Sequence, residues 1–384
     1  MKILRIKVDG LPLYKDSFDV MFCAVQRVQE NHLNMVYNLF GNIYTNNVQA
    51  YIGINASGKT TALKILSFTS NLLSGAALDS APYNSIIGEG KKAIFMVDFY
   101  YNEKIYHLES VITKYKKSDG KYEIKILKER LFVKTASSKI NKTNLLDFKG
   151  IEPIRVRSDF DEYLRDDVSI MIAVNKQIEN KTIYIDLIEY TNINLFIPGD
   201  ATVPTEIVSL LDPTIEYIKI EKINDKSVTK LKFYEKEEMV LSGLGELNAY
   251  LSSGTVKGLR VFSDAVNVLK NGGYLVVDEV ENHFNRELVA SLIRVFMNKR
   301  TNPRGATIVF STHYPELLDE LERNDSIYIT RNQQGLCVDN LNSLISRNDM
   351  RKSEVYQSDF LKGTAPKYKA VAAYQKRIIK SMED

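Results

Sequence analysis

The stretch Gly53-Ile-Asn-Ala-Ser-Gly58-Lys59-Thr60 decides the fold, because it fits the pattern G-x-x-x-x-G-K-[ST] of a phosphate-binding loop. The run Ala50-Tyr-Ile52 before it predicts a strand, and Thr61-Ala-Leu-Lys-Ile-Leu66 after it predicts a helix. The two glycines let the backbone curl, so that consecutive N–H groups point at phosphate oxygens at the N-terminal end of the helix. The sequence therefore predicts a strand, a phosphate-binding loop and a helix in that order.

Side chains of this loop are expected to hold ATP and magnesium. Lys59 would reach the β- and γ-phosphates, the Thr60 hydroxyl would ligate magnesium, and Thr61 would donate to the α-phosphate. The predicted nucleotide contacts of the loop are Gly53, Asn55, Ala56, Ser57, Gly58, Lys59, Thr60 and Thr61. A chance match to the pattern is the alternative, and the strand and helix on either side disfavour it.

An apolar strand that ends in two carboxylates supplies a second candidate part of the site. In Tyr274-Leu-Val-Val-Asp278-Glu279, Asp278 would hold magnesium and Glu279 would be the general base that orients the attacking water. Carboxylates are also common where a solvated loop begins, so this assignment depends on the phosphate-binding loop. His313 follows a further strand and would donate to the γ-phosphate and hold Glu279 and the water; the alternative is a purely structural histidine.

Together with Leu251-Ser-Ser-Gly-Thr255, these motifs resemble those of ABC-class ATPases. Leu251–Thr255 is similar to their signature motif, and His313 to their switch histidine. The set looks like the soluble SMC-like and OLD-like ATPases, a group that includes AAA-type ATP/GTP phosphatases of antiphage operons. The resemblance covers residues 1–100 and 240–370. Leu241-Ser-Gly-Leu-Gly245 also resembles a signature, but it lies too early in the chain.

The resemblance implies a homodimer with two ATP molecules sandwiched between protomers. Ser252, Ser253 and Gly254 would contact the γ-phosphate bound to the other subunit, and 281–285 would cross the interface. A magnesium-sensing glutamine is also expected, and Gln177, after an apolar run, is the candidate; a solvated helix position is the alternative. The implied fold is α/β, an ABC-type P-loop NTPase head with a mixed sheet core, an antiparallel β meander and a helical insert lobe.

Hydrophobic patterning places the expected elements along the chain. An opening hairpin over 2–20 and a meander over 92–134 are expected, with an Asn-rich polar insertion at 24–47. Further predicted strands are 183–187, 215–234, 273–277, 306–310 and 326–330. Predicted helices are 159–180, 203–212, 254–270, 285–299 and 315–322. The predicted domains are a nucleotide-binding core at 1–100 and 240–345, an insert lobe at 101–239 and a basic helical tail at 346–384.

Composition narrows the class of protein. The 384 residues carry 51 Lys and Arg against 48 Asp and Glu, and only two cysteines, which excludes a disulfide framework. No export signal or membrane span is evident, so a cytoplasmic location without a membrane partner is expected.

The motifs, the resemblance and the composition are compatible with three functions. The first is an ATP-hydrolysing sensor or switch for a separately encoded effector, such as a nuclease or toxin, in antiphage defence. The second is a DNA-binding repair or clamp ATPase, in which the basic tail Lys367–Lys380 holds phosphates; a solvated helix face is the alternative reading of that tail. A transporter ATPase subunit is the third, and the ambiguous magnesium-sensing glutamine and the β-rich 92–134 disfavour it.

Overall fold

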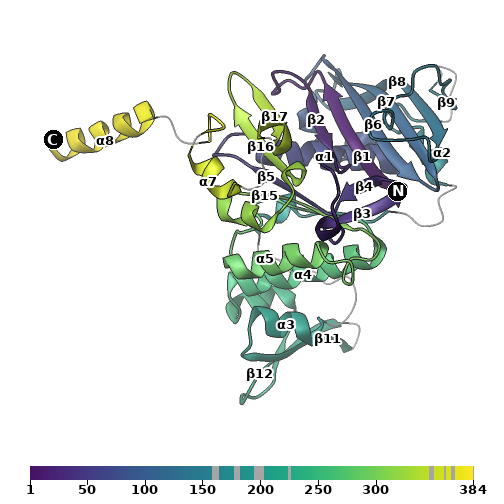
Figure 1. Cartoon of the computed structure of the whole chain (residues 1–384). Helices are drawn as coiled ribbons and strands as arrows, with labels where there is room; N and C mark the ends of the chain where they lie inside the picture. The colour runs from purple at the N-terminus through teal and green to yellow at the C-terminus, as the bar shows by residue number, and fades with distance from the viewer. Residues whose placement is uncertain are drawn as a thin grey trace. The chain divides into compact units, whose positions relative to one another are not determined.

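The structure is a computed structural model of the chain that describes residues 1–157, 164–176, 182–193, 203–223, 226–345, 350–358, 360–364 and 368–383. The chain divides into two compact units (Figure 1). Unit 1 comprises Met1–Lys181 and Ser311–Asp384, and unit 2 comprises Thr182–Phe310. Unit 2 is thus inserted into the sequence of unit 1. The predicted domains group the residues expected to bind nucleotide, whereas the two units group residues that pack together. The predicted domain division therefore stays a prediction.

The first sheet of unit 1 is antiparallel and has the strand order β2-β1-β6-β7-β8-β9. Its strands are β1 (Lys2–Asp9), β2 (Phe18–Met21), β6 (Lys92–Tyr101), β7 (Lys104–Lys116), β8 (Tyr122–Thr135) and β9 (Arg155–Val156). Asn102 and Glu103 between β6 and β7 both have positive φ, as a two-residue type I′ hairpin turn requires. The predicted opening hairpin and the predicted meander are therefore confirmed.

A second group of strands in unit 1 leads into the predicted phosphate-binding loop. Strand β5 (Val48–Ile52) is buried throughout and pairs in parallel with β16 (Ile327–Asn332), which pairs antiparallel with β17 (Leu336–Asn340). The rings of Tyr51 and Tyr328 stack across β5 and β16 with centroids 5.2 Å apart. Helix α1 (Lys59–Ser74) follows the loop and ends at Gly75, whose φ of 70° suits glycine.

The Asn-rich insertion predicted at 24–47 contains regular structure. Strands β3 (Val36–Phe40) and β4 (Ile43–Asn46) form an antiparallel hairpin there. The turn at Gly41 has positive φ, and the side chain of Asn38 donates to the Gly41 carbonyl at 3.0 Å. One of the asparagines of the insertion thus stabilises a tight turn.

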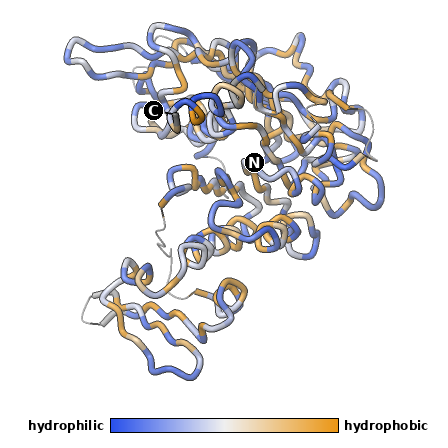
Figure 2. The backbone as a smooth tube through the Cα atoms, turned by 90° about the vertical axis from the view of Figure 1, so that its left-hand side faces the viewer, coloured by the Kyte–Doolittle hydropathy of each residue, from blue (hydrophilic) through white to orange (hydrophobic). Residues whose placement is uncertain are grey.

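Unit 2 contains the predicted strands 183–187, 273–277 and 306–310, which pair in parallel. Strand β10 (Tyr184–Asp186) pairs in parallel with β14 (Tyr274–Val277), and β14 pairs in parallel with the part of β15 (Thr307–Thr312) up to Phe310. Helices α4 (Ser253–Asn271) and α5 (Arg286–Phe296) flank β14 in the sequence. Helix α3 (Thr205–Leu211) precedes an antiparallel group of β11 (Ile215–Ile223), β12 (Lys226–Phe233) and β13 (Met239–Leu241). Figure 2 shows hydrophobic and hydrophilic segments alternating along the chain in both units.

Two predicted helices need correction. In the described part of 159–180, the only α-helix is the short α2 (Met171–Asn175), with turns at 164–170 before it. The predicted helix at 315–322 is a 3₁₀ helix, η6 (Pro315–Glu320). Pro315 occupies its first position, where a missing N–H is tolerated.

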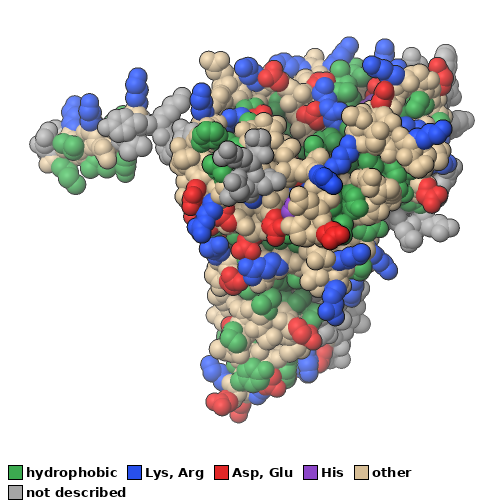
Figure 3. All heavy atoms as spheres, viewed as in Figure 1, with side chains coloured by type: hydrophobic (Ala, Val, Ile, Leu, Met, Phe, Trp, Pro, Cys, Tyr) green, Lys and Arg blue, Asp and Glu red, His purple; other side chains and the backbone are tan. Residues whose placement is uncertain are grey.

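Short helices complete the described chain. The 3₁₀ helices are η1 (Glu30–His32), η2 (Leu78–Ser80), η3 (Asn84–Ile86), η4 (Ile188–Tyr190), η5 (Leu244–Ala249) and η7 (Asn324–Ser326). The remaining α-helices are α6 (Leu341–Leu344), α7 (Lys352–Gln357) and α8 (Tyr368–Glu383). On α8, Lys and Arg side chains and hydrophobic side chains lie on opposite sides (Figure 3). No helix among the described residues combines the length and apolar character needed to cross a membrane.

Candidate functional site

The predicted phosphate-binding loop lies between β5 and α1, as the sequence indicates. Its backbone turns through left-handed conformations at Ala56 (φ 60°) and Gly58 (φ 99°), and Gly58 is the N-cap of α1. A Cβ on Gly53 would lie 2.5 Å from the Thr330 carbonyl oxygen, a separation that real Cβ atoms do not tolerate. The glycine at 53 is therefore required by the close approach of β16, and the glycine at 58 by its positive φ.

Lys59 bends back over the loop. Its buried ammonium donates to the Gly53 carbonyl at 2.9 Å and to the Ile54 carbonyl at 3.3 Å. The Nδ1 atom of His313 lies 3.4 Å from the same ammonium. The structure thus brings together two sequence-predicted residues, Lys59 and His313, within unit 1. The positive end of the α1 dipole lies at the same place, which makes this end of the loop favourable to an anion.

Two residues of β16 support the loop, and the sequence analysis did not identify either. Thr330 Oγ1 lies 2.7 Å from Ser57 Oγ and donates to the Ile52 carbonyl at 3.2 Å. The amide of Asn332 donates to the Ala56 carbonyl at 3.3 Å. Thr330 is buried at the end of a predicted strand, and no signal in the sequence indicated its contact with the loop.

The carboxylate pair follows β14 in unit 2. Asp278 is buried, with 5% of its surface exposed, and Glu279 has a φ of 46°. Left-handed backbone is uncommon for a residue with a Cβ and concentrates at functional sites. The Glu279 carbonyl accepts the N–H of Asn282 at 2.8 Å, so the chain turns tightly after the pair.

The predicted signature motif forms the N-terminus of α4. Ser252 is the N-cap, and its hydroxyl accepts the Thr255 N–H at 3.0 Å. Gly254 lies so close to the turn after the carboxylates that an added Cβ would come well within 3.0 Å of the His283 carbonyl oxygen. Ser253 Oγ lies 3.2 Å from His283 Nδ1. The signature and the carboxylate turn are thus in direct contact within unit 2.

The other sequence-predicted residues are placed as follows. Asn55 and Ala56 are exposed at the tip of the loop, and Thr60 and Thr61 are half-buried in the first turn of α1. Leu241–Gly245, the competing signature, spans the end of β13 and the start of η5, so it opens a 3₁₀ helix instead of α4. Gln177 lies outside the described residues.

Lys257 is a buried cation that the sequence analysis missed. It lies three residues after Gly254 on α4 and is 5% exposed. Burial lowers its pKa to about 8, and the neighbouring Glu279, Glu281 and Asp278 oppose this shift. A lysine inside a predicted helix gives no sequence signal that distinguishes it from a solvated one.

A strand, a glycine-containing loop and a helix of this kind, within a mixed α/β fold, define the class of P-loop nucleotide-binding proteins. A protein-family comparison matches residues 52–319 to the family described as "AAA domain, putative AbiEii toxin, Type IV TA system". This match covers more than half of the chain, and the chain belongs to that family. A comparison with curated proteins found no match.

Proposed function

We propose that this protein is an ATP hydrolase that uses its hydrolytic cycle to switch a partner protein. One observation carries the proposal: the Lys59 ammonium lies at the base of a left-handed loop at the N-terminus of α1, beside His313. Loop N–H groups, a lysine and a helix N-terminus are the groups that bind triphosphate. Membership of an AAA-domain family supports the same chemistry.

Residues of unit 1 would bind and orient the triphosphate. Loop N–H groups between Gly53 and Gly58 would donate to phosphate oxygens, together with Thr61 of α1. Lys59 would leave the Gly53 carbonyl for the β- and γ-phosphates, with His313 donating to the γ-phosphate. The occupied state would thus exchange a contact to a neutral carbonyl for contacts to charged oxygens, which attract the ammonium more strongly.

Thr60 and Asp278 are the proposed magnesium ligands. A hydroxyl and a carboxylate are the oxygen donors that magnesium prefers, and the ion takes its other ligands from water and phosphate. Bound there, magnesium would neutralise charge that develops on the phosphates.

Glu279 is the proposed general base. It would accept a proton from the attacking water as the water oxygen bonds to the γ-phosphorus and the bond to the β–γ bridging oxygen breaks, which yields ADP and phosphate. Its left-handed backbone, uncommon for a residue with a Cβ, is of the kind that concentrates at functional sites.

The switch part of the proposal rests on the signature residues and the family. Ser252, Ser253 and Gly254 would contact ATP bound to a second copy, as the resemblance to SMC-like and OLD-like ATPases implies. A family described as a toxin of a type IV toxin–antitoxin system supports a protein partner. We propose a separately encoded effector in antiphage defence as that partner, such as a nuclease or toxin, and a cytoplasmic location for both.

ATP hydrolysis measured together with oligomeric mass tests the proposal. Wild type is expected to hydrolyse ATP with magnesium and to dimerise with ATP, whereas Glu279→Gln should stay an ATP-bound dimer with hydrolysis lowered roughly 100-fold or more. Glu287→Gln is the control, because Glu287 lies on α5 with 73% of its side chain exposed. Equal hydrolysis by Glu279→Gln and wild type would remove Glu279 as the base. A wild type without hydrolysis would refute the proposed activity.

The alternative function is a DNA-binding clamp ATPase. The observation that favours it is the row of exposed cations on α8, formed by Lys369, Lys376, Arg377 and Lys380; Lys367 lies outside the described residues. A DNA mobility shift at two salt concentrations tests it, since phosphate contacts make affinity fall steeply with salt. An affinity that does not change with salt would exclude phosphate contacts by α8.

A further inference from the structure

The Lys257 ammonium lies at a junction of three segments of unit 2. It belongs to α4, and it donates to the Thr191 carbonyl, just after η4, at 3.2 Å. The same carbonyl accepts the side-chain amide of Asn282, in the turn after the carboxylates, at 2.8 Å. One carbonyl oxygen therefore joins the signature helix to the carboxylate turn.

Further contacts close the junction. The ammonium of Lys257 lies 5.8 Å from the centre of the Phe284 ring, and the guanidinium of Arg260 lies 5.2 Å from the centre of the Tyr190 ring. The rings of Phe262 and Phe284 meet edge to face at 6.3 Å. Helix α4 thus packs its next turn against both η4 and the carboxylate turn.

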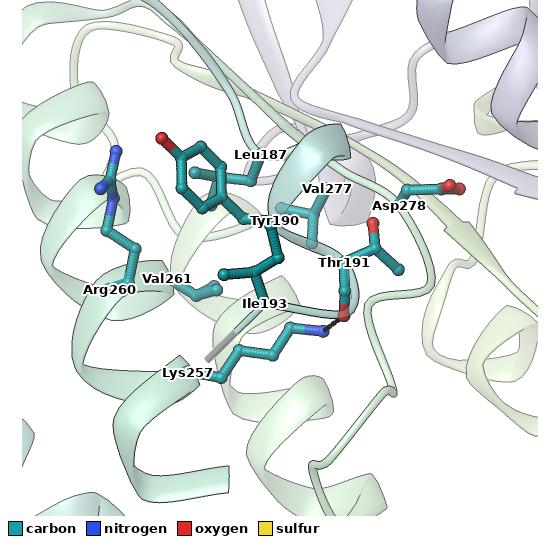
Figure 4. Close-up of a pocket in the computed structure, with 9 residues that line it drawn as sticks. All are labelled: Leu187, Tyr190, Thr191, Ile193, Lys257, Arg260, Val261, Val277 and Asp278. Atoms are coloured by element: carbon teal, nitrogen blue, oxygen red, sulfur yellow. Dashed lines mark hydrogen bonds between the residues drawn. The ribbon is translucent and has the colours of Figure 1, made fainter. Parts of the chain in front are cut away.

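A small pocket lies beside the junction, between η4, α4 and the end of β14. Figure 4 shows the Lys257 side chain directed at Thr191. Val277 and Asp278, at the end of β14, lie on the opposite side of Thr191 from Lys257. The lining is mostly apolar, so few groups there can replace water around a charge. Burying the Lys257 ammonium here therefore costs free energy of desolvation, unless nearby carboxylates stabilise its charge.

The charged and titratable groups around Lys257 come from each packed segment. They are Asp278, Glu279 and Glu281 after β14, Arg260 on α4 itself, and Tyr190 on η4. The three carboxylates belong to one turn of four residues, and the Lys257 charge favours keeping them near each other. Without a cation, mutual repulsion would push the turn apart.

We propose that Lys257 is a positioning residue: it joins α4 to the turn 278–282 through the Thr191 carbonyl and so fixes Glu279 for water activation. This inference rests on the proposed ATP hydrolysis and extends it. Movement at Ser252–Gly254, when the signature meets ATP, would pass through Lys257 to Glu279 within a single turn of α4.

Protonation of Lys257 follows as a measurable consequence. Its charge is present below its pKa of about 8 and is lost as the pH rises above that value. Hydrolysis should therefore fall on the alkaline side with an apparent pKa near 8. An arginine at 257 stays protonated, so Lys257→Arg should keep its activity to higher pH.

The experiment measures kcat and KM for ATP against pH in wild type, Lys257→Met, Lys257→Arg and Lys270→Met. Lys257→Met should lower kcat roughly 10- to 100-fold with little change in KM, as expected for a misplaced base. Lys257→Arg should recover most of kcat, and its kcat should no longer fall at alkaline pH. Lys270, exposed in the last turn of α4, is the matched control and should behave as wild type.

Two outcomes separate the inference from the proposed function. If wild type hydrolyses ATP, Glu279→Gln does not, and Lys257→Met matches wild type in kcat and alkaline limb, then the positioning role is refuted and the hydrolase stands. If wild type is inactive, the hydrolase proposal fails. Hydrogen exchange then tests whether Lys257 joins α4 to the carboxylate turn. Lys257→Met should speed exchange in a peptide covering 278–284; unchanged protection there would overturn the inference.

Discussion

Replacing Arg323 by methionine tests how strongly one buried ion pair stabilises unit 1. The side chains of Arg323 and Asp325 are 1% and 0% exposed, and Arg323 Nη2 lies 2.6 Å from Asp325 Oδ2. The same guanidinium donates to Asn46 Oδ1 at 3.3 Å and to the main-chain carbonyls of Gln26 and Arg27 at 3.2 and 3.4 Å. It therefore ties the segment before β16 to β4 and to the chain before β3.

The magnitude follows from what Arg323→Met leaves behind. Asp325 would remain buried without its cation, and loss of one partner from a buried pair costs about 3–5 kcal/mol. The pair of Arg294 and Glu287 on α5 is a control of the same chemistry, 2.8 Å apart but 50% and 73% exposed. An exposed pair contributes at most about 1 kcal/mol, so Arg294→Met should scarcely change stability.

Urea denaturation followed by circular dichroism gives the comparison. Arg323→Met should lower the free energy of unfolding by about 3–5 kcal/mol, and adding Asp325→Leu should restore part of the loss, since no unpaired charge then stays buried. A loss no larger than that of Arg294→Met would refute the assignment of stability to this pair.

Three further predictions concern a loop, a helix start and a titrating pair. Gly53→Ala should greatly weaken binding of a fluorescent ATP analogue, whereas Gly243→Ala, with open space around it, should bind like wild type; equal affinities would contradict the close approach of β16. Gly254→Ala should lower the free energy of unfolding by about 1–3 kcal/mol through overpacking, and an unchanged denaturation midpoint would contradict it. Burial lowers the pKa of His107, but the Asp98 carboxylate, 2.7 Å from its Nδ1, and the Glu109 carboxylate together outweigh this and raise the pKa above its ordinary value. The stabilisation is complete below the unfolded pKa and is lost as pH rises through the folded pKa, so His107→Gln should cost more stability at about pH 6 than at about pH 9. A cost independent of pH would exclude the ion pair as its origin.

Local patterns predicted most of the regular structure. Alternation over 2–20 and 92–134, and the short apolar runs at 273–277 and 306–310, indicated strands that the structure contains. Strand β17 (Leu336–Asn340) was not predicted, because only its pairing with β16 makes these residues a strand. Patterns cannot reveal such long-range pairing.

The sequence predicted those residues of the candidate site that belong to motifs. It missed the residues that contribute only through packing. The loop Gly53–Thr60 and the pair Asp278-Glu279 follow from residue order, since glycine, lysine and carboxylates have few other reasons to occur in that spacing. Thr330 and Lys257 act through contacts to residues far away in the sequence. No local pattern distinguishes them from ordinary strand and helix residues.

The hydrogen bond between Ser57 and Thr330 has a consequence for synthesis on the ribosome. The two residues are 273 positions apart, so the phosphate-binding loop emerges long before the strand that supports it. At translation rates of about 5–20 residues per second, the loop would wait roughly 14–55 s for Thr330. During that interval the nascent chain has β5 and α1 but not β16. The supported loop can form only after translation has passed Thr330, within the last third of the chain.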